Sequence, residues 1–139
     1  MKNILFFILG MSLLSIQVFA KNCKDVKLKV INNFKINQDD TKSPTIKVSS
    51  IYYNEGKGWR YENVKDKEIK GGKSHTFTEN LEYVGGERIN AFYVKFKFKN
   101  GKEWSKTYRS EPITRGWHHN DKCSKGDSFN LKFSRGKKD

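Results

Sequence analysis

Long apolar stretches, cysteines and prolines are all scarce in this 139-residue chain. After residue 20, no apolar run is long enough to cross a membrane as a helix, and no window shows helical spacing of apolar residues. The two prolines, Pro44 and Pro112, fall in apparent loops, and there is no internal repeat or low-complexity linker. These absences favour one domain without a transmembrane span.

The common motifs of nucleophilic and metal-dependent catalysis are also missing. There is no Gly-x-Ser-x-Gly, no His-Glu-x-x-His and no free cysteine paired with a histidine. A ribonuclease-like site could be assembled from Glu111, His118 and Arg115, but almost any chain of this size offers such a trio. Adjacent residues of an extended chain point apart, so His118 and His119 are poor joint metal ligands even with Asp121 nearby. We expect no enzyme, no metal and no cofactor.

The first twenty residues have the pattern of an export signal. Lys2 provides a positive start, residues 4–16 provide a short apolar core, and Val18–Ala20 provides a small-x-small cleavage site. We therefore expect residues 1–20 to be a cleaved signal peptide. Residues 21–139 would then form a single secreted or periplasmic domain.

Two cysteines, Cys23 and Cys123, follow this signal. Asn22 before Cys23 argues against lipid attachment, and the absence of Cys-x-x-Cys argues against a reactive thiol. In an oxidising compartment an even pair predicts one disulfide. Both cysteines precede apolar alternating segments, 26–30 and 129–133, so we expect these two strands to lie side by side and parallel.

Positive charge dominates the chain after the signal and is uneven along it. Residues 21–87 contain thirteen Lys and Arg against ten Asp and Glu, whereas residues 88–139 contain fourteen against five. A basic excess of this size favours acidic partners such as anionic glycan, phospholipid headgroups, lipopolysaccharide or nucleic acid. The alternative explanation is that the positive charge serves only to keep the protein soluble.

The chain consists of short segments in which apolar residues alternate with lysine or other polar residues, the pattern of half-buried antiparallel strands. The clearest segments are 26–30, 46–48, 92–98 and 129–133, and weaker ones lie around Tyr52, 59–64, 75–83 and 104–108. We predict an all-β fold, a single antiparallel β-sandwich of immunoglobulin-like architecture with about seven or eight strands and one disulfide. A small barrel is the second choice, and the Cys-Trp-Cys spacing of antibody domains is absent.

Lysines and aromatic residues share one side of segment 92–98, and Tyr93, Lys95, Lys97 and Arg109 are candidate binding residues. Alternatively, this side of the segment is simply exposed to solvent, and its lysines prevent strands from pairing edge to edge. A two-residue turn at Asn100-Gly101 would put Trp104 and Tyr108 on the lysine side. We favour a bulged turn instead, which turns Trp104 toward Phe96 and Tyr108 toward Phe92 and so buries fewer polar residues.

The longest segment without strand pattern, between residues 109 and 128, provides the remaining candidate binding residues. These are Arg115, Trp117, His118 and His119. If this loop recognises a ligand, Trp117→Ala should weaken binding and leave the melting temperature nearly unchanged. If it only covers the core, the same substitution should cost about 3–5 kcal/mol of stability. A thermal melt distinguishes the two.

Together these features predict an exported, monomeric binding protein whose partner is an anionic glycan or lipid headgroup. Nucleic acid is a less favoured partner. A membrane-active toxin is the main alternative class, although its best membrane-crossing candidate, segment 75–83, contains Glu79 and Glu82. A periplasmic inhibitor or adaptor is a further alternative that the sequence does not separate.

Overall fold

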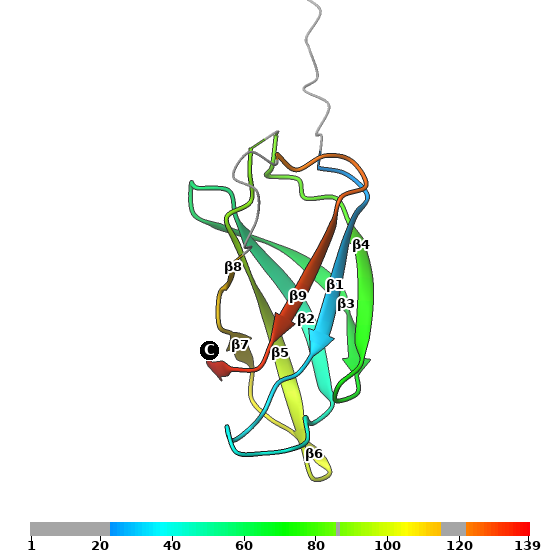
Figure 1. Ribbon diagram of the computed structural model, residues 1–139, viewed down its shortest axis with the longest axis vertical. Coiled ribbons are helices and arrows are strands. Elements are labelled where there is room, and N and C mark those ends of the chain that lie inside the picture. The colour runs from blue at the N-terminus through cyan, green and yellow to red at the C-terminus, as the bar shows by residue number, and fades with distance from the viewer. Residues whose placement is uncertain (1–22, 86, 115–121) are drawn as a thin grey trace, which may run out of the picture.

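The computed structural model describes residues 23–85, 87–114 and 122–139, which contain ten β-strands and no helix. The strands form two sheets that face each other in two layers, as a sandwich and not a closed barrel (Figure 1). The smaller sheet has the order β4 (Ser74–Glu79), β1 (Val26–Asn32) and β9 (Ser128–Phe133). The larger sheet has the order β10 (Gly136–Lys138), β7 (Tyr108–Ser110), β5 (Ala91–Asn100), β2 (Ile46–Asn54) and β3 (Trp59–Ile69), and β6 (Glu103–Trp104) and β8 (Ile113–Thr114) also pair with β5. The predicted all-β sandwich is confirmed.

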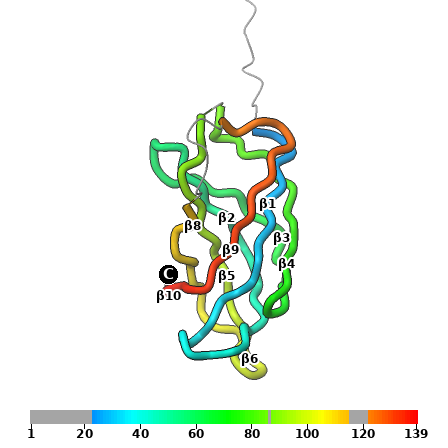
Figure 2. The backbone as a smooth tube through the Cα atoms, in the orientation of Figure 1, coloured from blue at the N-terminus to red at the C-terminus, as the bar shows by residue number. Residues whose placement is uncertain are grey.

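Strand β1 is the centre of the smaller sheet. Its apolar residues are buried and alternate with exposed lysines, because one face meets the core and the other meets solvent. Leu28 pairs with Phe77 of antiparallel β4 and with Phe129 of parallel β9. Strands β1 and β9 therefore lie side by side (Figure 2) and run in the same direction, and the parallel pairing expected from the cysteines is confirmed.

The disulfide ties the start of this sheet to the segment before its last strand. Cys23 and Cys123 are bonded, with their Cα atoms 5.1 Å apart and a sequence separation of 100. Both are buried. The Cys23 carbonyl accepts the Leu81 N–H at 3.0 Å, and the Cys123 N–H donates to the Glu87 carbonyl at 3.3 Å. The bond thus joins β1, β9 and the segment after β4 at one end of the sandwich.

Aromatic rings from both sheets fill the core. Phe92 and Phe96 of β5 contact Phe129 and Phe133 of β9, with ring centroids 5.1 and 5.0 Å apart respectively. Phe34, which follows β1, packs its edge against Phe96 at 4.9 Å. These tilted and edge-on contacts are the geometry that aromatic pairs prefer, and they hold the two layers together.

The turn between β5 and β6 differs from both registers considered in the sequence. Asn100 pairs with Glu103, so the turn consists of the two residues between them. Gly101 has a φ of +66° and the residue after it has no positive φ, which is the pattern of a type II′ turn with glycine first. The favoured bulged register is therefore wrong. Trp104 does not face Phe96 but pairs with a lysine of β5 on the solvent side of the sheet.

The candidate strand 104–108 is interrupted. The Ser105 hydroxyl accepts the Phe98 N–H at 2.9 Å and takes the place of a backbone partner. The register shifts by one residue between β6 and β7 as a result, and Tyr108 faces Phe96, not Phe92. The expectation that Tyr108 packs against the core is met, although its partner lies four residues further along β5 than expected.

The end of one strand and the number of strands also differ from expectation. Strand β4 ends at Glu79 and not near Tyr83, because the chain turns there and the Val84 N–H bonds to the Leu81 carbonyl at 3.1 Å. The count of ten strands in the described residues exceeds the seven or eight expected, since the short strands β8 and β10 have no recognisable pattern in so few residues.

Candidate functional site

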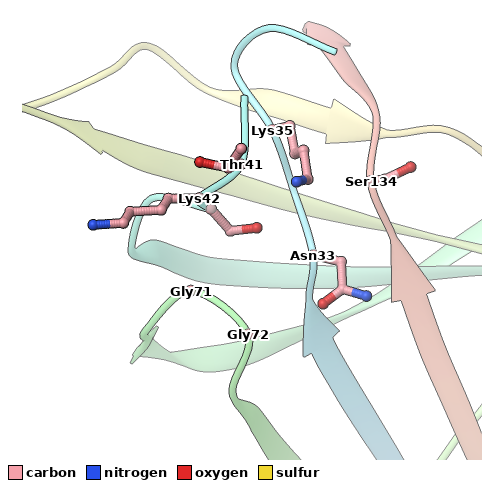
Figure 3. Close-up of a pocket in the computed structure, with 8 residues that line it drawn as sticks. Asn33, Lys35, Thr41, Lys42, Gly71, Gly72 and Ser134 are labelled. Carbon is pink, nitrogen blue, oxygen red and sulfur yellow. The ribbon is translucent and has the colours of Figure 1, made fainter. Parts of the chain in front are cut away.

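A hollow of about 600 Å³ lies between the β1–β2 loop and the β3–β4 turn, but it lacks convergent charges. One of its two lysines, Lys35, is held by the loop itself, because its ammonium donates to the Asp40 carbonyl at 2.6 Å. The side chain of the other, Lys42, points away from Lys35 (Figure 3). Gly71 packs so closely against Ser43 that a Cβ would collide with its carbonyl. These features describe tightly packed turns, and we assign no ligand to them.

The outer face of the larger sheet, the side turned away from β1, β4 and β9, has a more distinctive composition. Aromatic residues gather where β2 ends and β5 begins, and lysines gather at the opposite end of the same strands. We call the aromatic set the aromatic ladder and the basic set the lysine cluster. The ladder consists of Trp59, Tyr61, Tyr52 and Tyr93, and the cluster consists of Lys47, Lys97 and Lys99 around Trp104.

A β-bulge places both sets on one face. Strict alternation along β2 would send Lys47 and Tyr52, five residues apart, to opposite faces. The β2–β5 register shifts between Val48 and Ser50, so β2 uses one residue more than β5 over this stretch. Lys47 consequently pairs with Lys97 of β5, while Tyr52 pairs with Tyr93 on the same side.

The aromatic ladder crosses three strands. Tyr52 of β2 lies between Tyr61 of β3 and Tyr93 of β5, stacked on both with centroid distances of 5.1 and 4.3 Å. Trp59 packs against Tyr93 at 4.6 Å with its ring steeply inclined. Burial raises the pKa of Tyr93, and Tyr52 raises it further. Each ring of the ladder therefore contacts at least one other ring of the set.

The lysine cluster surrounds an indole. The Lys47 ammonium lies 4.2 Å from the Trp104 ring centroid and the Lys99 ammonium 5.8 Å from it, both within cation–π range. Within the described residues, no ion pair involves Lys47, Lys97 or Lys99. A hollow of about 310 Å³ opens here, lined by Lys47, Lys97, Trp104, Ser49, Thr107 and Asp66. The cluster therefore presents positive charge that the described chain does not neutralise by pairing.

Lys95 and Arg109 lie between the two sets, and Lys95 is already paired with an acidic residue. The Lys95 ammonium forms an ion pair with Asp139 at 2.8 Å and lies 4.8 Å from the Tyr52 ring. Hydrogen bonds to Asp139 and then to the Tyr52 hydroxyl raise the pKa of Lys95. The Arg109 guanidinium lies 5.9 Å from the Tyr93 ring. Lys95 is therefore neutralised by an acid, whereas Arg109, like the lysine cluster, has no ion-pair partner among the described residues.

A third hollow, of about 410 Å³, lies at the free edge of β3, and we call it the edge hollow. Trp59, Tyr61 and Tyr83 line it with exposed fractions of 39, 50 and 54%. The Arg60 guanidinium lies 5.0 Å from the Tyr83 ring. Its remaining lining residues are Glu62, Asn63 and Glu82. Exposed aromatic surface and polar groups therefore meet at one place.

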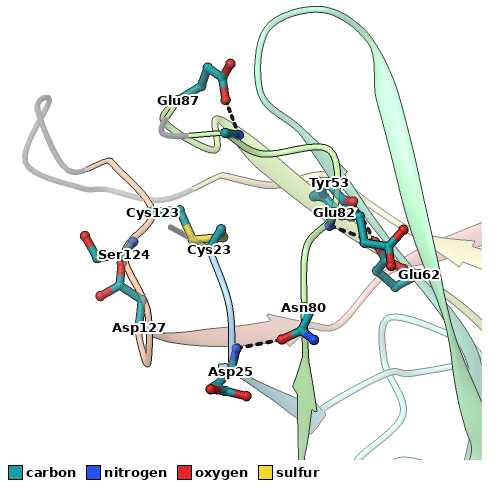
Figure 4. The surroundings of a disulfide bond; sticks show 11 residues. Cys23, Asp25, Tyr53, Glu62, Asn80, Glu82, Glu87, Cys123, Ser124 and Asp127 are labelled. Atoms are coloured by element: carbon teal, nitrogen blue, oxygen red, sulfur yellow. Dashed lines mark hydrogen bonds between the residues drawn. A yellow bond between two sulfur atoms is a disulfide. The ribbon is translucent and has the colours of Figure 1, made fainter. Parts of the chain in front are cut away.

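Glu62 is the fixed polar group of the edge hollow. Its Oε1 accepts the Tyr53 hydroxyl at 2.8 Å and the Glu82 N–H at 3.3 Å (Figure 4, which also shows the nearby disulfide). Burial, followed by the hydrogen bond and charge of Glu62, raises the pKa of Tyr53 far above its usual value. Tyr53 consequently stays protonated and keeps the Glu62 carboxylate in place at any physiological pH.

The residues predicted as binding residues divide into two groups. Tyr93, Lys95, Lys97 and Arg109 come together on the outer face of the larger sheet. The other four lie outside the described residues and stay predictions: Arg115, Trp117, His118 and His119. Sequence reasoning missed Lys47, Tyr52, Trp59 and Tyr61, which the pairing of β2 with both β3 and β5 adds to this face.

Comparison with protein-family models, with curated protein sequences and with solved structures finds no match for this chain. Among the residues that the structure describes, no helix has the length and apolarity needed to span a membrane.

Proposed function

We propose that this chain is an exported, monomeric, non-catalytic binding domain that recognises an anionic glycan, lipid headgroup or lipopolysaccharide through the outer face of its larger sheet. The observation that carries the proposal is the lysine cluster. The ammonium groups of Lys47 and Lys99 lie over Trp104, Lys97 lines the same hollow, and none of the three has an ion-pair partner among the described residues. Clustered unpaired charge attracts an anionic partner and raises its association rate.

The opposite face of the sandwich shows that lysines alone do not single out a site. Lys27, Lys29 and Lys132 project from the outer face of the smaller sheet, where they are exposed and alternate with core residues. That face carries the half-buried Ile31 but no aromatic ring in the outward register, whereas the half-buried indole of Trp104 lies within the lysine cluster. The cluster therefore combines charge with an apolar ring, a composition that favours specific contact over simple solvation.

Removing the cluster should weaken anionic binding. We expect the triple variant Lys47→Ala, Lys97→Ala, Lys99→Ala to leave a heparin column at clearly lower salt than the parent protein and to lose binding to phosphatidylglycerol vesicles. Loss of three ammonium groups reduces an attraction that salt already screens with a Debye length of about 10 Å at 0.1 M. The measurements are elution conductivity and vesicle co-sedimentation.

A triple variant of the smaller sheet provides the matched control. Lys27→Ala, Lys29→Ala, Lys132→Ala removes the same formal charge from the opposite face. We expect this protein to elute close to the parent. Equal shifts for the two triple variants would show that net charge alone governs binding and would contradict the proposed site.

A further inference from the structure

We infer that the ligand is an acidic glycan, which seats a sugar ring in the edge hollow and directs its anionic groups to the lysine cluster. This inference rests on the proposed function and narrows it from any anionic surface to one chemical class.

The first step is the location of exposed apolar surface. Within the described residues, four large hydrophobic side chains are exposed, and three of them line the edge hollow: Trp59, Tyr61 and Tyr83. The fourth, Ile36, is not among its lining residues. Single exposed apolar residues are ordinary, but their concentration in one hollow marks an interaction site.

The second step is that these rings are held in place before any ligand binds. Tyr61 stacks on Tyr52 and Trp59 packs against Tyr93, so neither ring is free to collapse into the hollow. Arg60 lies over the Tyr83 ring. Groups that are ordered in the free protein lose little conformational entropy on binding, which favours affinity.

The third step is the chemistry between the rings. Glu62, held by Tyr53 and the Glu82 N–H, presents a carboxylate, and Glu82 and Asn63 add further polar side chains. A pyranose ring has an apolar C–H face that fits an aromatic ring and hydroxyl groups that can donate to carboxylate and amide oxygens. A bare phosphate or sulfate would instead be repelled by the carboxylates of Glu62 and Glu82. A quaternary ammonium would compete with Arg60, which already lies over Tyr83.

The fourth step is the distance to the positive charge. Lys47 precedes Tyr52 by five residues on β2, which corresponds to about 17 Å at ~3.3 Å per strand residue. Tyr52 stacks on Tyr61, so the aromatic rings extend from the hollow on β3 as far as β2, while Tyr93 on the next strand is only 8% exposed. A chain of sugars can contact both regions at once, whereas a single lipid headgroup reaches only one.

The test measures binding of size-defined oligosaccharides from heparin, chondroitin sulfate and alginate by calorimetry, with phosphatidylglycerol vesicles as the sugar-free anionic probe. For the tightest oligosaccharide, we expect Trp59→Ala and Tyr83→Ala each to weaken affinity by about tenfold or more, as for an aromatic anchor. Neither variant should change vesicle binding or the salt dependence of oligosaccharide binding. Ile36→Ala removes the exposed apolar residue outside the hollow and should leave affinity unchanged.

The outcomes separate this inference from the proposed function. If the lysine triple variant weakens binding but Trp59→Ala and Tyr83→Ala do not, the glycan inference is overturned and the anionic site stands. If the lysine triple variant has no effect, the proposed function fails and the inference fails with it. Tyr83 contacts only Arg60 among the ring contacts described, so Tyr83→Ala tests the hollow even if Trp59→Ala loosens the ladder.

Discussion

Removing the disulfide by the double substitution Cys23→Ala, Cys123→Ala is expected to lower the free energy of unfolding by about 2–5 kcal/mol. The bond closes a loop of 100 residues, so its loss greatly enlarges the set of conformations open to the unfolded chain. It also releases β1, the central strand of a sheet of only three strands. Urea denaturation followed by tryptophan fluorescence measures the change.

The slope of the same denaturation curve tests the mechanism. An unfolded chain without the cross-link is less compact, so the m value should rise while the midpoint falls. Treating the parent protein with dithiothreitol should reproduce both changes. Ser124→Ala, an exposed substitution beside Cys123, is the control and should change stability by less than about 0.5 kcal/mol. A loss below about 1 kcal/mol in the double variant would mean that loop closure contributes little here.

The parts of the fold that the sequence predicts correctly depend on local pattern. Strands β1 and β9 alternate apolar and polar residues without interruption, and each burial pattern follows that alternation. Each cysteine lies a few residues before one of these strands, which is why the parallel pairing could be inferred from the disulfide.

The errors arise where tertiary contacts replace local ones. No local signal indicates that the Ser105 hydroxyl takes the Phe98 N–H, yet this bond accompanies the break between β6 and β7. No sequence pattern predicts the bulge on β2 either, although it brings Lys47 and Tyr52 to one face. The sequence therefore predicts part of the candidate site, namely Tyr93 and the lysines of β5, whereas the other aromatic residues join it only once β3, β2 and β5 are placed in order.

Substitution of the buried residue Asn32 is expected to lower the stability of the fold about as much as loss of the disulfide. Asn32 is 0% exposed. Its amide nitrogen donates to the carbonyls of Pro44 at 2.7 Å and Ile69 at 2.9 Å, and its carbonyl accepts the Phe34 N–H at 3.2 Å. One side chain thus fastens the end of β1 to the entry of β2 and to the end of β3.

Asn32→Asp keeps the shape but replaces the double donor with an acceptor. The Pro44 and Ile69 carbonyls lose their donor and face a carboxylate, and at about 1–3 kcal/mol for each unsatisfied group the expected loss of stability is about 2–6 kcal/mol. Asn33→Asp makes the same charge change at a partly exposed neighbour and should cost under about 1 kcal/mol.

Burial between two carbonyls should raise the pKa of the carboxyl introduced by Asn32→Asp in the folded state, so the folded protein binds its proton more tightly than the unfolded one. The defect should then be smallest in acid and grow as the pH rises above about 4, the usual aspartate pKa. Urea titrations of both variants between pH 4 and 8 measure this, and equal losses at positions 32 and 33 would contradict the role assigned to Asn32.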